Sequence, residues 1–126
     1  MNPMSADEVR WRLLISAGED YKNLYEALWE FGLPDHATAQ SPDIDTVKTT
    51  LERLVSDGLV RLYWCAEVYG DMTPVAAAEQ SAVFDDEHNW RIPQQGETGV
   101  RFTTTPAGDD ALRHRPEGLP DIAWHT

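Results

Sequence analysis

The sequence has one cysteine, few basic residues and no long apolar run. Because Cys65 is the only cysteine, no internal disulfide can form, and this usage is typical of a reducing cytoplasm. No stretch approaches the roughly 20 apolar residues that cross a bilayer. The N-terminal MNPMSADEVR lacks the basic start and apolar core of a signal peptide. We therefore expect a cytoplasmic protein that engages no membrane, folded as a single domain over residues 1–126 with terminal segments 1–4 and 116–126.

Lysine and arginine are scarce relative to the acidic residues. Ten basic residues face 22 acidic ones, which gives a net charge of −12 at pH 7 and an isoelectric point near 4.5. Such a surface repels nucleic acid and acidic lipid, and it favours basic partners. The general acidity of many bacterial cytoplasmic proteins is a second explanation of the same number.

What the sequence does contain is a strongly patterned stretch at residues 41–64. Ser41 is predicted to cap a helix, Pro42 to occupy its first position, and Gly58 to end it in the left-handed conformation. A single apolar stripe at helical spacing joins Ile44, Val47, Leu51, Leu54 and Val55.

The residues after Gly58 switch to β-formers. Their alternation predicts a strand with two distinct faces. One face carries Val60, Leu62 and Trp64, and the other carries Leu59, Arg61 and Tyr63.

Two helices are predicted before this stretch. Ser5 and Glu8 fit a capping box that begins a helix running to Ala17. Asp20 is predicted to cap a second helix, and residues 33–41 form a connector. The apolar stripe of that second helix is Tyr21, Leu24, Tyr25, Leu28 and Phe31.

After the central strand the pattern alternates between helix and strand. The strand is expected to continue through Val68, and Thr73 and Pro74 are expected to begin an alanine-rich helix that ends near Phe84. A further strand covers residues 100–103, and a last helix, AGDDALRHR, follows Thr105 and Pro106. Four apolar side chains are expected to fold back onto the core or dock the tail: Trp90, Ile92, Ile122 and Trp124.

Two stretches resemble winged helix-turn-helix regulators of the MarR, PadR and GntR kind. TVKTTLERLVSDGLVRLY (residues 46–63) is similar to their recognition helix and first wing strand, and GVRFTTTPAGDDAL (residues 99–112) to their second wing strand and next helix. Together they cover about a quarter of the chain. The resemblance implies an α+β winged helix-turn-helix fold with three N-terminal helices, a two- or three-stranded sheet, an enlarged wing that contains a helix, and a C-terminal helix.

The same resemblance implies that the outward face of the central helix enters a DNA major groove. Threonine and lysine would contact phosphates there, and Arg53 would read a guanine edge. A solvated helix face is the other interpretation of these residues. The recognition-helix residues are Thr46, Lys48, Thr49, Thr50 and Arg53.

The segment between the two wing strands has the wrong charge for DNA. It is about 35 residues long, where the family has a tight hairpin, and Arg91 is its only basic residue. Because non-specific DNA affinity comes from neutralising phosphates, such a wing would oppose binding. We name five of its acidic residues the acidic surface: Glu67, Asp71, Asp85, Asp86 and Glu87.

No motif predicts catalysis, a cofactor or a metal. The run 85–88 (DDEH) and the pair Asp110 and His114 lack a second set of ligands, and no serine lies in GxSxG. There is no glycine-rich phosphate loop. Trp11 and Trp29 lie on helices whose stripes are already supplied, so each is either at the edge of the core or in an interface. We therefore expect a protein that is not an enzyme.

Two functions fit these observations. The first is an acidic binding module that engages a basic protein partner, as an adaptor, an antitoxin or immunity-type neutraliser, or a regulator. The alternative is a DNA-binding transcriptional regulator, acting as a homodimer, with Thr49, Thr50 and Arg53 reading bases. A basic strip beside the central helix would favour the second function, and it would join Lys48, Arg53, Arg61 and Arg101.

Overall fold

The computed structural model describes residues 4–66 and 71–119, and in these residues the fold is α+β, as expected. The described residues form one antiparallel sheet with the strand order β1-β4-β2-β3, which is larger than the two- or three-stranded sheet expected. Its strands are β1 (Lys22–Asn23), β2 (Val60–Cys65), β3 (Met72–Pro74) and β4 (Gly99–Thr104).

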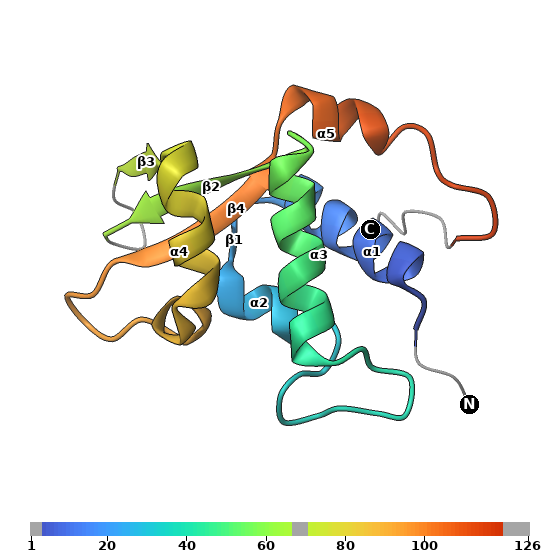
Figure 1. Cartoon of the computed structure of the whole chain (residues 1–126), viewed down its shortest axis with the longest axis horizontal. Helices are drawn as coiled ribbons and strands as arrows, with labels where there is room; N and C mark the ends of the chain where they lie inside the picture. The colour runs from blue at the N-terminus through green and yellow to red at the C-terminus, as the bar shows by residue number, and fades with distance from the viewer. Residues whose placement is uncertain (1–3, 67–70, 120–126) are drawn as a thin grey trace.

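Along the chain, the helices lie before, between and after these strands. In Figure 1, α3 lies at the centre, α1 lies behind it and to its right, and α4 lies to its left. Two short 3-10 turns, η1 (Ala77–Glu79) and η2 (Glu87–Trp90), flank α4. The helices are α1 (Ala6–Glu19), α2 (Leu24–Trp29), α3 (Ile44–Ser56), α4 (Gln80–Asp85) and α5 (Pro106–Ala111).

The core lies between the helices and one face of the sheet. Leu62 of β2 and Phe102 of β4 are cross-strand partners, and both are fully buried. Because strand side chains alternate between faces, their neighbours Arg61 and Arg101 lie on the opposite face of the sheet. The helices contribute further fully buried side chains, which include Val9, Leu13, Leu24, Val47, Leu51 and Leu54.

The first helix forms as predicted. The hydroxyl of Ser5 accepts a hydrogen bond from the backbone N–H of Glu8 at 3.2 Å, and the helix continues to Glu19, two residues beyond the predicted end. Trp11 is buried in the core with 3% of its surface exposed.

The second helix does not begin at Asp20 as predicted. Lys22 and Asn23 pair instead with Phe102 and Arg101 of β4, and α2 begins only at Leu24. The apolar periodicity was compatible with a helix throughout, but pairing to a distant strand satisfies the backbone of residues 22–23 and prevails locally.

The start of the central helix was also predicted two residues too early. Asp43 is the N-cap, and its carboxylate accepts a hydrogen bond from the N–H of Thr46 at 2.7 Å. The hydroxyl of Ser41 donates instead to the carbonyl of Phe31 at 2.8 Å, so it holds the preceding loop. The stop at Gly58 is confirmed, because this residue has φ +77°.

Residues 73–79 do not begin a helix as predicted. Thr73 and Pro74 belong to β3, where they pair with Trp64 and Tyr63. Because β3 is an edge strand, the missing N–H of Pro74 interrupts no inner ladder. The expected helix in this segment is therefore confirmed only as the short α4.

The remaining expectations have mixed outcomes. The last helix ends at Ala111, earlier than predicted, and Trp90 folds onto the core as predicted, with 6% exposed. Ile92 does not, because 60% of its surface is exposed. Val68, Ile122 and Trp124 lie outside the described residues.

Candidate functional site

The outward face of α3 exposes only part of the predicted recognition set. Thr49 and Arg53 are exposed, whereas Thr46, Lys48 and Thr50 are half-buried. The hydroxyl of Thr50 donates to the carbonyl of Thr46 one turn earlier, at 2.6 Å, so its proton is used within the helix. Two of the five side chains are therefore displayed to solvent as a recognition helix requires.

Lys48 is held by an aromatic ring. Its Nζ lies 5.1 Å from the centroid of the Trp90 ring, a distance at which a cation and an aromatic face attract each other. The indole N–H of Trp90 donates to the carbonyl of Phe84 at 3.1 Å, which fixes the ring. Phe84 and Trp90 both belong to the 75–98 segment. This segment therefore packs along the flank of α3 beside Lys48.

The four cations proposed as a basic strip do not lie on one face. Arg61 lies over the ring of Tyr63, with its guanidinium carbon 5.8 Å from the ring centroid, and Tyr63 is the cross-strand partner of Arg101. These residues occupy the sheet face directed away from the core. Lys48 and Arg53 project from α3, on the other side of the sheet.

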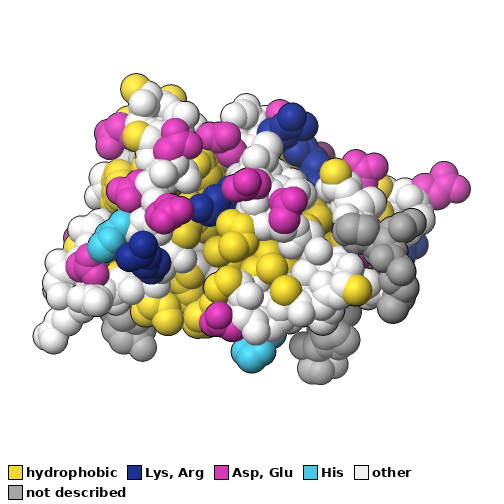
Figure 2. All heavy atoms as spheres, turned by 60° about the horizontal axis from the view of Figure 1, so that its bottom comes forward, with side chains coloured by type: hydrophobic (Ala, Val, Ile, Leu, Met, Phe, Trp, Pro, Cys, Tyr) yellow, Lys and Arg dark blue, Asp and Glu magenta, His cyan; other side chains and the backbone are white. Residues whose placement is uncertain are grey.

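The described part of the acidic surface is exposed. Asp71, Asp85, Asp86 and Glu87 all lie at the surface, and Glu67 lies outside the described residues. A guanidinium nitrogen of Arg91 approaches a carboxylate oxygen of Glu87 to 4.0 Å in an exposed pair, which neutralises little. Figure 2, which turns the lower side of Figure 1 toward the viewer, shows acidic side chains bordering a central group of hydrophobic ones.

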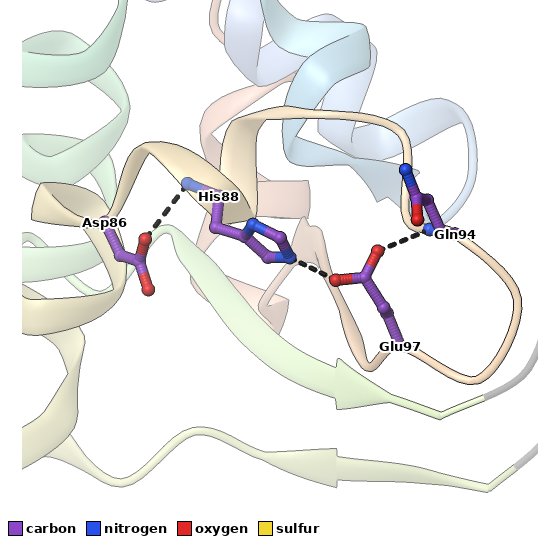
Figure 3. Close-up of polar contacts among 4 residues, drawn as sticks. All are labelled: Asp86, His88, Gln94 and Glu97. Atoms are coloured by element: carbon purple, nitrogen blue, oxygen red, sulfur yellow. Dashed lines mark hydrogen bonds and ion pairs between the residues drawn. The ribbon is translucent and has the colours of Figure 1, made fainter.

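A small polar network shapes the loop that leads into β4 (Figure 3). One carboxylate oxygen of Glu97 accepts from the N–H of Gln94 at 2.8 Å, and the other is paired with Nε2 of His88. The backbone N–H of His88 in turn donates to a carboxylate oxygen of Asp86 at 3.0 Å. The Gln94 N–H first, and His88 second, hold the pKa of Glu97 below its usual value. The network therefore joins η2 to the loop and fixes both ends of the 88–97 stretch.

A hollow of about 760 Å³ lies beneath this loop. Tyr25 of α2 and Arg101 of β4 form part of its wall, and Ile92 lies at the loop side. Burial raises the pKa of the Tyr25 phenol, Glu26 adds to the increase and Arg101 opposes it. The other lining residues are Asn23, Cys65, Ala66, Pro93, Gln94, Gln95, Gly96, Glu97 and Gly99.

An aromatic pair adjoins the hollow. Trp29 has 54% of its surface exposed and packs edge-to-face with the half-buried Tyr25, with the ring centroids 4.9 Å apart. We name Tyr25, Trp29 and Ile92 the aromatic surface. The sequence placed Tyr25 and Ile92 in the core and left Trp29 open. In the structure the buried residues of α2 are Leu24, Ala27 and Leu28, whereas Tyr25 is half-buried. The usable signal was Trp29 itself, an apolar residue outside that stripe.

No metal site or membrane span is found in the described ranges. Within residues 4–66 and 71–119, no three His, Cys, Asp or Glu side chains are grouped so that they could hold a metal ion. Within the same ranges no helix is both long enough and apolar enough to cross a membrane. Comparison with protein-family models, with curated proteins and with solved structures gave no match.

Proposed function

We propose that this chain is a winged-helix module that binds a basic protein partner instead of DNA. The winged-helix assignment is supported by three N-terminal helices in front of a sheet in which β1, β4 and β2 are neighbours. In this assignment α3 corresponds to the recognition helix, and the described residues between β2 and β4 correspond to an enlarged wing. The lone, buried Cys65 supports the cytoplasmic setting that we propose with it.

The observation that carries the proposal is the dispersal of the cations. A protein that binds duplex DNA places several Lys and Arg side chains where they reach successive phosphates. Here Arg61 and Arg101 lie across the sheet from Arg53, and Lys48 lies over Trp90. The enlarged wing instead presents carboxylates, which attract Lys and Arg of a protein partner and speed its encounter.

A duplex titration and a peptide titration together test the proposal. A labelled mixed-sequence duplex of about 30 base pairs is expected to show no binding at low salt. A designed helical peptide of about 18 residues, with leucine at i, i+3, i+4 and i+7 and arginine elsewhere, is expected to bind at about 150 mM salt. The same peptide with glutamate in place of arginine is the control and is expected not to bind.

The acidic surface is tested by neutralising it. The combined substitutions Asp71→Asn, Asp85→Asn, Asp86→Asn and Glu87→Gln remove charge at exposed positions without removing volume. We expect the arginine peptide to bind at least about tenfold more weakly to this variant. Duplex binding whose affinity falls steeply with salt, or no binding of the arginine peptide, would overturn the proposal.

A DNA-binding transcriptional regulator, as a homodimer, is the second candidate. It is favoured by the exposure of Thr49 and Arg53 on α3, where a groove-reading helix would need them. If this candidate holds, Arg53→Ala costs about 1–3 kcal/mol of binding to a preferred duplex and relaxes its sequence preference. Arg113→Ala, a change at an exposed arginine after α5, is the matched control.

A further inference from the structure

We propose that the aromatic surface, Tyr25, Trp29 and Ile92, is the anchor point for the apolar side of a basic amphipathic segment of the partner. This inference rests on the proposed function, because it names the place on the molecule where the partner is held. Tyr25 connects the other two side chains, since its ring packs against Trp29 and it lines the same hollow as Ile92.

The exposure of Trp29 and Ile92 is unusual for such large apolar residues. Trp29 is 54% exposed and Ile92 is 60% exposed. Aromatic residues that are exposed and already held in position contribute most of the binding energy in many interfaces. Tyr25 provides that support here, because the two rings pack in an edge-to-face arrangement.

The charges around this surface select a basic partner. Glu26 lies on the same helix as Trp29, and Glu30 caps that helix. Asp86 caps η2 and Glu87 begins it, and η2 contacts α2. An arginine of the partner can lie over the exposed Trp29 ring while it pairs with these carboxylates. The segment's leucine-type side chains would contact Ile92 and Tyr25 and enter the hollow.

Arg101 determines which part of the segment enters the hollow. Arg101 lines the hollow and acts to lower the pKa of the Tyr25 phenol, which burial raises, so its positive charge disfavours a partner cation deep in the same space. The cations of the segment are therefore expected at the rim, beside Glu26 and Glu30, and the apolar side chains inside. This division is what a helix with one apolar face and one basic face supplies.

The experiment uses the whole chain and the leucine–arginine peptide described above. In a ¹⁵N-labelled sample each of the five tryptophans gives one indole N–H signal, and that of Trp29 is assigned by its disappearance in Trp29→Phe. Addition of the peptide is expected to shift the Trp29 signal more than that of the buried Trp11. Trp29→Ala and Ile92→Ser are each expected to weaken peptide binding about tenfold or more.

Tyr21→Ala is the matched control, because Tyr21 is an exposed aromatic, at 41%, that packs against Tyr63 on the outer sheet face. It is expected to leave peptide affinity unchanged. Equal losses of peptide affinity in Tyr21→Ala and Trp29→Ala would overturn the inference. A Trp29 signal that shifts when the protein concentration alone is raised would also overturn it, because that shift indicates binding of a second copy of the chain.

One outcome separates this inference from the proposed function. If neutralising the acidic surface weakens binding while Trp29→Ala and Ile92→Ser do not, the module binds a basic partner at another place, and only this inference fails. If the peptide binds neither wild type nor any variant, both fail together.

Discussion

Thr105 connects two parts of the chain through one hydroxyl group. It accepts a hydrogen bond from the N–H of Gly108 at 3.1 Å, which caps α5, and it donates to the carbonyl of Gly58 at 2.6 Å. Thr105→Ala removes both bonds, and we expect it to lower the free energy of unfolding by about 1–2 kcal/mol. Chemical denaturation measures the loss. Thr105→Ser keeps the hydroxyl and should stay close to wild type, and an equal loss in both variants would contradict this account.

Glu97 gives a prediction that depends on pH. Its pKa lies below the ordinary value of 4.5, first because of the Gln94 N–H and second because of His88. A carboxyl group whose pKa is lower in the folded state contributes stability above its unfolded pKa, and this contribution is lost as pH falls through the folded pKa. We therefore expect the loop joining η2 to β4 to loosen as the pH falls below 4.5.

NMR titration of the Glu97 side-chain carboxyl measures this pKa directly. His88→Ala should move it only part of the way back toward its ordinary value, because the first cause, the Gln94 N–H, is retained. A complete return in His88→Ala would show that the imidazole dominates, contrary to the contacts described above.

At the scale of elements, α5 is held against the start of β2 by a close backbone approach at Gly108. A Cβ placed there would lie 2.0 Å from the carbonyl oxygen of Leu59, so the helix could not stay where it is. Gly108→Ala is expected to destabilise the protein by about 2 kcal/mol or more, although alanine favours helices elsewhere. Thermal unfolding measures it. Ala107→Ser, at an exposed position of the same helix, serves as the control and should cost far less.

Four buried side chains attach the 75–98 segment to the core, and two of them, Phe84 and Trp90, are aromatic. Trp90 packs against Phe84, with ring centroids 6.1 Å apart, and it lies beneath the amine of Lys48. Trp90→Ala is expected to cost about 3–5 kcal/mol, since it leaves a large cavity in the core. Arg91→Ala changes the neighbouring exposed residue and should have little effect. Hydrogen exchange would show whether residues 80–90 lose protection first, as we expect.

These elements also show what sequence reasoning could reach. The helix at 44–56, the Gly58 stop and the strands at 60–65 and 99–104 were predictable, because strong periodicity and local chemistry coincide there. The pairing of Lys22 and Asn23 with β4 was not, because its cause lies in a distant strand. The pairing of Thr73 and Pro74 with β2 was not either, because it depends on contact with a neighbouring strand and not on local helix signals. For the candidate site, residue types indicated the outward face of α3. They did not indicate that Lys48 lies over the Trp90 ring or that the Thr50 hydroxyl donates to the Thr46 carbonyl, because both contacts depend on the folded geometry.

At the scale of the whole molecule, the excess of acidic residues sets how the protein responds to salt. With a net charge of −12, the folded state carries like charges at close range, and the exposed carboxylates of the acidic surface are among them. Added salt screens this repulsion, since the Debye length falls from about 30 Å at 0.01 M to about 8 Å at 0.15 M. The folded state is the more compact one and gains the most from screening.

We therefore expect the thermal midpoint to rise on going from about 10 mM to about 150 mM sodium chloride. The variant in which Asp71, Asp85, Asp86 and Glu87 are neutralised should melt higher than wild type at the low salt concentration and should respond less to added salt. Differential scanning calorimetry measures both quantities. A midpoint that falls with salt would mean that attractive pairs, such as Arg10 with Asp57 at 2.8 Å and Arg12 with Glu8 at 2.8 Å, outweigh the repulsion. That result would also weaken the case for a partner attracted by charge. The negative potential that attracts a partner's cations is the same potential that makes the protein's own carboxylates repel one another.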